Sequence, residues 1–224
     1  MHNCTVKPVT QLRNEARPPP APASLARHFN VPMLLTWARI AMIPMLVGVY
    51  YLPEAWLSSF AKNLTSCALF TIAAITDAID GWYARKYGQI TRLGAFLDPV
   101  ADKLMVCAAL VVLLWLDRVA PFVALVIVGR EIAVSALREW MAGIGASASV
   151  AVNWLGKTKT IVQMIAIPVL LFHQPLFGVI PVAAIGTALI YIAAVLTVYS
   201  MLYYLRLAWP HLSGSGELPG EGHK

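Results

Sequence analysis

Residues Asp77 to Asp102 read DAIDGWYARKYGQITRLGAFLDPVAD and hold four of the eleven acidic residues of the chain. They lie where one strongly apolar segment ends and the next begins. Asp77 and Asp80 are three residues apart and Asp98 and Asp102 are four apart, so on helices each pair shares one face. Ionised carboxylates near a membrane are costly unless a strong cation compensates them. The stretch therefore predicts a divalent-metal site in which these four aspartates are the ligands.

The composition of the chain restricts its class. Of 224 residues 59% are hydrophobic and only 12% are charged, and the mean hydropathy is +0.69. These values are typical of a polytopic membrane protein with one membrane domain and exclude a soluble domain of this length. The net charge of +6 is best explained by orientation in the membrane and contact with anionic lipid, so we expect a lipid bilayer and no nucleic acid as a partner. The cysteines and histidines show no metal-binding spacing.

The apolar segments predict an all-α integral membrane protein with six transmembrane helices. We expect them at about residues 33–52, 62–83, 94–116, 121–141, 155–172 and 176–207. The last segment is longer than a bilayer requires. Residues 24–32 are expected to form a short interfacial segment at the N-terminal side of the first helix. The domain division is a membrane domain over residues 28–207, with disordered tails at 1–27 and 208–224.

Basic residues give the orientation of these helices. Six spans place both termini on one side of the membrane, and almost all lysines and arginines fall on or near that side. Only Lys62 and Arg118 mark the other side. The positive-inside rule makes the first side cytoplasmic. Both termini and the acidic stretch are therefore expected to face the cytoplasm.

Each aspartate also has a simpler interpretation when it is taken alone. Asp80 and Gly81 are compatible with a turn, and Asp98 before Pro99 is compatible with a helix N-cap. One cap needs one acid, however, and four acids on facing surfaces of a helical hairpin need more than that. Four carboxylates suit two Mg²⁺ or Mn²⁺ ions, an arrangement used for in-line phosphoryl displacement.

The neighbours of the aspartates fit a phosphate-bearing ligand. The small residues Gly81, Ala84 and Gly94 leave room beside the acids, and Arg85 is placed to contact phosphate oxygens. Arg39 lies two turns inside the first span. A lone arginine there is expected to face the helix bundle and an anion or carboxylate.

The spacing of the stretch resembles that of the CDP-alcohol phosphatidyltransferases, whose pattern is D-x2-D-G-x2-A-R-x8-G-x3-D-x3-D. All eight fixed positions match: Asp77, Asp80, Gly81, Ala84, Arg85, Gly94, Asp98 and Asp102. The resemblance implies that the aspartates bind the metal ions and the diphosphate of the donor. It also implies that Asp98 and Asp102 are catalytic, with Asp102 as the general base. The residues implied to bind CDP-diacylglycerol are Asp77, Gly81, Ala84, Arg85, Thr36 and Arg39.

A second group of residues concerns the acceptor alcohol. In GREIAVSALREW, Arg130 lies about two turns deeper than Arg138. Glu131, Ser135 and Arg138 share one helix face. Lys157 and Lys159 follow in GKTKT, where positive-inside flanking explains them if they are taken alone. Together, Arg130, Arg138, Lys157 and Lys159 predict a basic pocket for a second phosphate, which favours a phosphorylated polyol over serine, choline or ethanolamine.

The resemblance to the family extends over about residues 28–207, through NVPMLLTWARI, GREIAVSALREWMA, SVAVNWLGKTKT and AAVLTVYSMLYYL. It is greatest to bacterial members that use sn-glycerol 3-phosphate. It therefore implies CDP-diacylglycerol as donor, sn-glycerol 3-phosphate as acceptor, a homodimer and a place in the bacterial cytoplasmic membrane. Three alternatives stay open: a family member with another acceptor (inositol phosphate, or a cardiolipin synthase), a divalent-cation transporter, and an inactive structural homologue. Against a transporter, the acids gather at one membrane face only.

Overall fold

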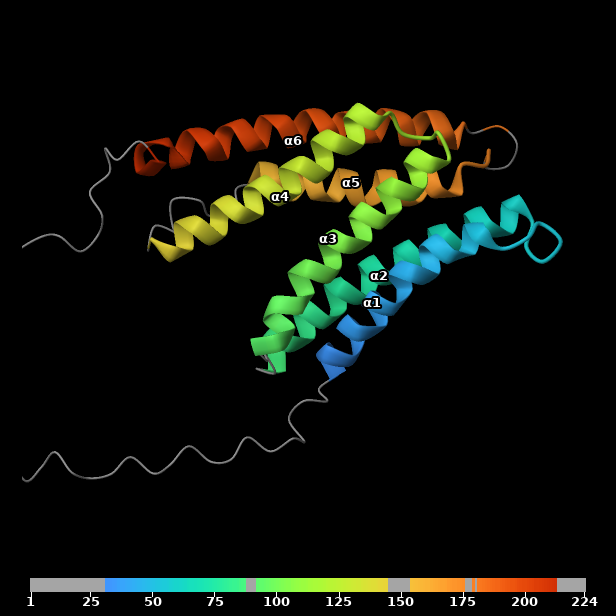
Figure 1. Cartoon of the computed structure of the whole chain (residues 1–224), viewed down its shortest axis with the longest axis horizontal. Helices are drawn as coiled ribbons and strands as arrows, with labels where there is room; N and C mark the ends of the chain where they lie inside the picture. The colour runs from blue at the N-terminus through green and yellow to red at the C-terminus, as the bar shows by residue number, and fades with distance from the viewer. Residues whose placement is uncertain (1–30, 88–91, 145–153, 176–178, 180, 213–224) are drawn as a thin grey trace, which may run out of the picture.

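The structure is a computed structural model that describes residues 31–87, 92–144, 154–175, 179 and 181–212. The predicted tail 1–27 and most of the predicted interfacial segment lie outside these residues. Within them the chain forms six α-helices and one 3-10 helix, and no strand (Figure 1). The helices are α1 (Val31–Gly48), η3 (Val49–Tyr51), α2 (Ser59–Tyr87), α3 (Arg92–Trp115), α4 (Pro121–Gly143), α5 (Trp154–Phe172) and α6 (Val182–Leu212).

Each predicted apolar segment corresponds to one of these helices, and the largest differences are at the boundaries. α2 continues past the predicted residue 83 to Tyr87. The predicted start of the last helix at residue 176 is wrong. α6 begins at Val182, directly after Pro181, because proline disfavours helical backbone in the residue before it. α6 also continues to Leu212, and its 31 residues correspond to a length of about 46 Å.

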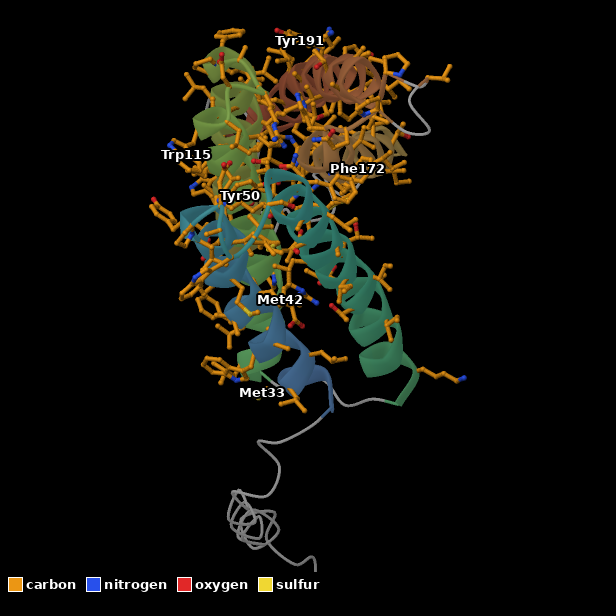
Figure 2. All side chains as sticks on the ribbon, turned by 90° about the vertical axis from the view of Figure 1, so that its right-hand side faces the viewer. Met33, Met42, Tyr50, Trp115, Phe172 and Tyr191 are labelled. Carbon is orange, nitrogen blue, oxygen red and sulfur yellow. The ribbon has the colours of Figure 1, made fainter. Side chains whose placement is uncertain are left out.

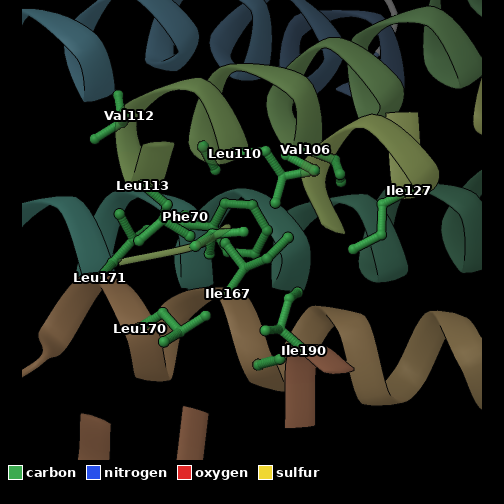
Figure 3. Close-up of a cluster of buried hydrophobic side chains, with 14 of the residues drawn as sticks. Phe70, Val106, Leu110, Val112, Leu113, Ile127, Ile167, Leu170, Leu171 and Ile190 are labelled. Carbon is green, nitrogen blue, oxygen red and sulfur yellow. The ribbon is translucent and has the colours of Figure 1, made fainter. Parts of the chain in front are cut away.

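The helices divide into two groups that meet along α2, α3 and α5. α1 packs against both α2 and α3, which contact one another less, whereas α6 packs against α5 and α4 (Figure 1). The core between the groups is apolar: Phe70 of α2, Leu110 and Leu113 of α3 and Ile167 of α5 converge in it (Figure 3). This core fixes the position of the first three helices relative to the last three. That position matters because α2 and α3 carry the predicted metal-binding aspartates, whereas α4 and α5 carry the predicted phosphate ligands.

Aromatic and polar contacts close the end of the bundle at which α1 ends and α2 begins. Tyr50 near the end of α1 lies beside Trp115 at the end of α3, with ring centroids 6.2 Å apart (Figure 2). Arg118 donates to the carbonyl oxygens of Leu170 (3.2 Å) and Leu171 (2.8 Å), and to Asn63 Oδ1 (2.9 Å). These carbonyls belong to the last turn of α5, where a cation is favourable.

Lys62 is held at the same end. Its Nζ donates to the carbonyl oxygen of Leu52 at 2.6 Å, and the residue is only 9% exposed. Lys62 and Arg118 are the two basic residues that the sequence assigns to the non-cytoplasmic side. Both bind main-chain carbonyl groups, so each has a structural reason to be there that is independent of orientation.

The apolar character of the chain extends to the surface of the helices. In the described residues, two helical stretches are long and apolar enough to cross a membrane, Met33–Tyr51 and Val182–Trp209. A shorter apolar stretch covers Thr158–Phe172. Large apolar side chains are exposed on all six helices. An all-helical structure with this surface is compatible with a membrane protein, while the six-span topology stays a prediction.

Candidate functional site

The backbone around the aspartates excludes the simpler interpretations of two of them. α2 continues through Asp80 and Gly81 to Tyr87, so this pair does not form a turn. α3 begins at Arg92, so Asp98 lies in the second turn of the helix and is not its N-cap. The two acidic pairs therefore lie near the C-terminal end of α2 and the N-terminal end of α3. Neither the turn proposed for Asp80 nor the capping role proposed for Asp98 explains these acids.

Residues of α1 hold two of the aspartates. Arg39 Nη1 lies 2.6 Å from Asp77 Oδ1 of α2, and Thr36 Oγ1 donates to Asp98 Oδ1 of α3 at 2.6 Å. Both α1 side chains are almost fully buried, with 1% of each residue exposed. The expectation that Arg39 faces the bundle and a carboxylate is confirmed. The sequence did not indicate that α1 would pack between α2 and α3, because helix-face contacts of this kind depend on tertiary packing.

Asp102 completes the acidic side of the site. It follows Asp98 by about one helical turn of α3, so the two carboxylates share a helix face. With Arg39, Asp102 also lines a small cavity between α1, α2, α3 and α5. Asp77 and Asp102 thus both lie beside Arg39, and two carboxylates beside one guanidinium leave net negative charge for a cationic ligand to compensate.

A cavity of about 720 Å³ opens beside Asp102. Its lining is contributed by α3, α4 and α5 and consists of Pro99, Asp102, Lys103, Arg130, Glu131, Val134, Ser135, Arg138, Lys159, Thr160 and Ile161. Three of the four predicted phosphate ligands, Arg130, Arg138 and Lys159, are therefore brought together. Glu131, Ser135 and Arg138 line it jointly, as their shared helix face predicts.

Two cations of this cavity, Arg130 and Arg138, are anchored by α6. Arg130 Nη2 donates to Ser200 Oγ at 3.2 Å, and Arg138 Nη2 donates to the hydroxyl of Tyr204 at 3.2 Å. The Tyr204 ring lies 5.2 Å from the Arg138 guanidinium carbon and 6.0 Å from that of Arg130, within cation–π range. In the described part of the chain, Nε of each arginine is buried and has no hydrogen-bond acceptor. Each arginine therefore has one N–H donor that no acceptor in the described part of the chain uses.

Lys159 and Glu131 form the closest ion pair of the cavity. Glu131 Oε1 accepts from Lys159 Nζ and lies 3.5 Å from Arg130 Nη1. Lys159 is 2% exposed, so Glu131 is the counter-charge that allows a cation to be buried there. The sequence pattern places Glu131 on the helix face of Ser135 and Arg138 but predicts no role for it in the site, and it does not indicate Lys103 or Thr160. The sequence feature that could have indicated Lys103 is its position directly after Asp102.

The residues implied to bind metal fit a hard divalent cation by their chemistry, because every donor is a carboxylate oxygen. Asp77 and Asp98 each use one carboxylate oxygen in the contacts with α1. Among the side chains that the structure describes, no three metal-ligating groups converge into one site. The side chains of Asp80, Ala84, Arg85 and Lys157 lie outside the described residues, so their predicted roles stay predictions.

Comparison with known proteins identifies the family of this chain. The CDP-alcohol phosphatidyltransferase family matches residues 29–199. The proteins named CDP-diacylglycerol--glycerol-3-phosphate 3-phosphatidyltransferase from Salmonella choleraesuis (strain SC-B67), Shigella flexneri and Escherichia coli (strain K12) are similar to this chain. Each is 47% identical to it over 187 residues, which cover 81% of this chain and 96% of the relative. The resemblance found in the aspartate spacing is confirmed, and the chain belongs to the CDP-alcohol phosphatidyltransferase family.

Proposed function

We propose that this protein transfers the phosphatidyl group of CDP-diacylglycerol to sn-glycerol 3-phosphate, giving phosphatidylglycerophosphate and CMP. The printed names of the relatives, which are 47% identical to it, support this reaction. The observation that carries the proposal is the position of Asp102. It lies beside Arg39 in the acidic group and also lines the basic cavity with Arg130 and Lys159.

This position suits a base that acts between two bound phosphates. The 1-hydroxyl of glycerol 3-phosphate attacks the phosphorus that carries diacylglycerol, a new phosphodiester bond forms and the phosphoanhydride bond to CMP breaks. Asp102 accepts the hydroxyl proton, and CMP leaves with the electron pair of the broken bond. No covalent enzyme intermediate is needed. Arg130, Arg138 and Lys159 hold the phosphate of the acceptor, which lowers the entropic cost of bringing the hydroxyl to the donor.

The residues on the acidic side bind and orient the donor. Thr36 fixes the carboxylate of Asp98, and Arg39 fixes that of Asp77, so both aspartates present a defined oxygen to the site. We propose that Asp77, Asp80, Asp98 and Asp102 hold two Mg²⁺ or Mn²⁺ ions. Such ions supply charge stabilisation for the diphosphate and for the CMP leaving group. Gly81, Ala84 and Arg85 are proposed to line the nucleotide part of the site.

The membrane placement is part of the same proposal. We propose that the helices span the bacterial cytoplasmic membrane with both termini and the acidic site on the cytoplasmic side, and that the protein is a homodimer. Exposed aromatic side chains near helix ends support the part of this proposal that concerns spanning the membrane. Trp140 and Trp209 lie near the C-terminal ends of α4 and α6, on the side of the site, and Tyr51 and Trp115 lie at the opposite end. Tryptophan and tyrosine gather at both interfaces of a membrane.

The test is release of CMP by the purified full-length chain in mixed micelles. The proposal requires that release depends jointly on CDP-diacylglycerol, glycerol 3-phosphate and a divalent cation. Replacing glycerol 3-phosphate by inositol phosphate distinguishes the nearest alternative: transfer to inositol phosphate without transfer to glycerol 3-phosphate would reassign the acceptor. Uptake of the cation into proteoliposomes without any CMP release would instead identify a transporter.

A further inference from the structure

We infer that Glu131 is a positioning residue of the basic cavity, and that its negative charge matches the cavity to a dianionic phosphate monoester. This inference rests on the proposed function, because it concerns how the acceptor is bound. It starts from the fact that Glu131 of α4 bridges two cations, Arg130 beside it and Lys159 of α5. One carboxylate oxygen thus fixes the two cations relative to each other across a helix interface.

The exposed fractions of the three side chains show how they are arranged at the surface of the cavity. The side chain of Glu131 is 20% exposed, whereas those of Arg130 and Lys159 are 6% and 2% exposed. The carboxylate therefore lies at the cavity surface with the cations behind it. An incoming phosphate therefore binds through N–H groups of Arg130 and Lys159 that Glu131 does not engage.

The cations have enough donors to bind both partners. An ammonium group has three N–H donors and a guanidinium group has five. Arg130 uses Nη1 toward Glu131 and Nη2 toward Ser200, while its Nε has no acceptor in the described part of the chain. Phosphate binding therefore does not require Glu131 to leave. Glu131 keeps the cations in place while their remaining donors turn to the phosphate.

Glu131 also sets the total charge of the cavity. Among the lining residues that the structure describes, Lys103, Arg130, Arg138 and Lys159 are cationic, and Asp102 and Glu131 are anionic. The lining thus carries a net charge of two positive units. A phosphate monoester carries about −1.5 to −2 at neutral pH, so the occupied cavity is close to neutral. Without Glu131 the cavity would hold the phosphate more strongly, and that phosphate stays on the lipid product.

A purely structural role for Glu131 makes a different prediction. A residue that only compensates buried cations lowers stability when it is removed, and the affinity for phosphate then falls because the cations lose their order. A residue that sets the charge and position of the cations gives the opposite sign: tighter phosphate binding together with slower turnover. The two roles therefore predict opposite changes in phosphate affinity when Glu131 is replaced.

The experiment compares Glu131→Gln with Glu139→Gln in the full-length chain. Glu139 lies on the same helix, is exposed and does not line the cavity, so its substitution makes the same change in net charge elsewhere. We expect Glu131→Gln to bind inorganic phosphate at least about threefold more tightly by calorimetry, since one opposing charge is gone. Its KM for glycerol 3-phosphate should fall, and its kcat should fall about tenfold. Glu139→Gln should match the native chain.

Unchanged or weaker phosphate binding by folded Glu131→Gln would overturn the inference, as would an unchanged kcat. If Glu131→Gln does not fold, Glu131→Asp decides. It keeps the charge but shortens the arm, so phosphate affinity should stay within about twofold while kcat falls several-fold; a native kcat would overturn the inference. Absence of phosphate-monoester binding by the native chain would overturn the proposed acceptor site itself. Glycerol 3-phosphate transfer that responds equally to both glutamine variants would remove only the role of Glu131.

Discussion

Arg39 of α1 and Asp77 of α2 form an ion pair in which Nη1 of the guanidinium lies 2.6 Å from Oδ1 of the carboxylate. The two side chains differ sharply in exposure, with 1% for Arg39 and 39% for Asp77. The cation is therefore enclosed by the protein while the carboxylate still faces the site. This asymmetry lets the pair orient Asp77 without withdrawing it from a ligand.

Removal of this cation tests its role. Arg39→Met should lower CMP release about 100-fold, because Asp77 loses both its orientation and its only described ion-pair partner. Arg39→Lys keeps the charge and should retain part of the activity, although lysine cannot reproduce the planar geometry of arginine. The exposed Arg206 of α6 provides the control, since Arg206→Met removes the same charge away from the aspartates. Native-like turnover by Arg39→Met would exclude Arg39 from the donor site.

The hydrogen bond from Thr36 to Asp98 permits a finer test. Thr36→Val keeps the shape of the side chain and replaces only the hydroxyl with a methyl group. A hydrogen bond to a charged group contributes about 1.5–3 kcal/mol, so activity should fall about tenfold or more. Thr36→Ser should restore most of it. The control is Thr71→Val, because the Thr71 hydroxyl bonds to the carbonyl of Cys67 in its own helix. Equal effects at both threonines would point to helix packing alone.

Neutral replacement of the central aspartates should abolish turnover with little effect on folding. Asp102→Asn removes the proposed base, and Asp98→Asn removes a proposed metal ligand, so each should lower the rate by at least about 100-fold. Asp117→Asn is the matched control. Asp117 lies beyond the opposite end of α3 with φ of 54°, a conformation that asparagine adopts readily. Near-native activity of Asp98→Asn or Asp102→Asn in metal-saturated assays would contradict the assignment.

A substitution in the basic cavity should change the KM for glycerol 3-phosphate more than the KM for CDP-diacylglycerol. Arg130→Ala removes a guanidinium that lines the cavity. The residue is 5% exposed, and its Nε has no hydrogen-bond acceptor in the described part of the chain. The KM for glycerol 3-phosphate should rise about tenfold or more, which corresponds to one lost charged hydrogen bond. The KM for CDP-diacylglycerol should change little. Steady-state kinetics with each substrate varied in turn measures the difference, and equal losses for both would take Arg130 out of the acceptor site.

Arg118 should contribute to stability rather than to catalysis. Arg118→Met removes three hydrogen bonds, two of them to the last carbonyls of α5, at the end of the bundle away from the aspartates. The free energy of unfolding should fall by roughly 2–4 kcal/mol. Thermal unfolding in detergent would report the loss, while the KM values of the folded fraction should be native. A changed KM would connect this end of the bundle to the site.

The sequence predicted the parts of the molecule that depend on local pattern. The apolar segments predict the helices because their length and composition act locally, and the aspartate spacing predicts which helix faces carry the acids. The packing of α1 between α2 and α3 was not predictable, since Thr36 and Arg39 find their partners only in the folded bundle. The role of Glu131 was hidden for the same reason: Lys159, its partner, is 28 residues away.

The four-residue interval between Asp98 and Asp102 gives α3 a further property. Asp98 accepts a hydrogen bond from α1, while Asp102 lines the cavity formed with α4 and α5. A residue inserted between them would rotate everything after it by about 100° and shift it by about 1.5 Å along the helix axis. Asp102 would then leave the cavity although every residue of the site was still present. Natural length variation in this protein should therefore be confined to the connections between helices, such as residues 52–58, and be absent from the first half of α3.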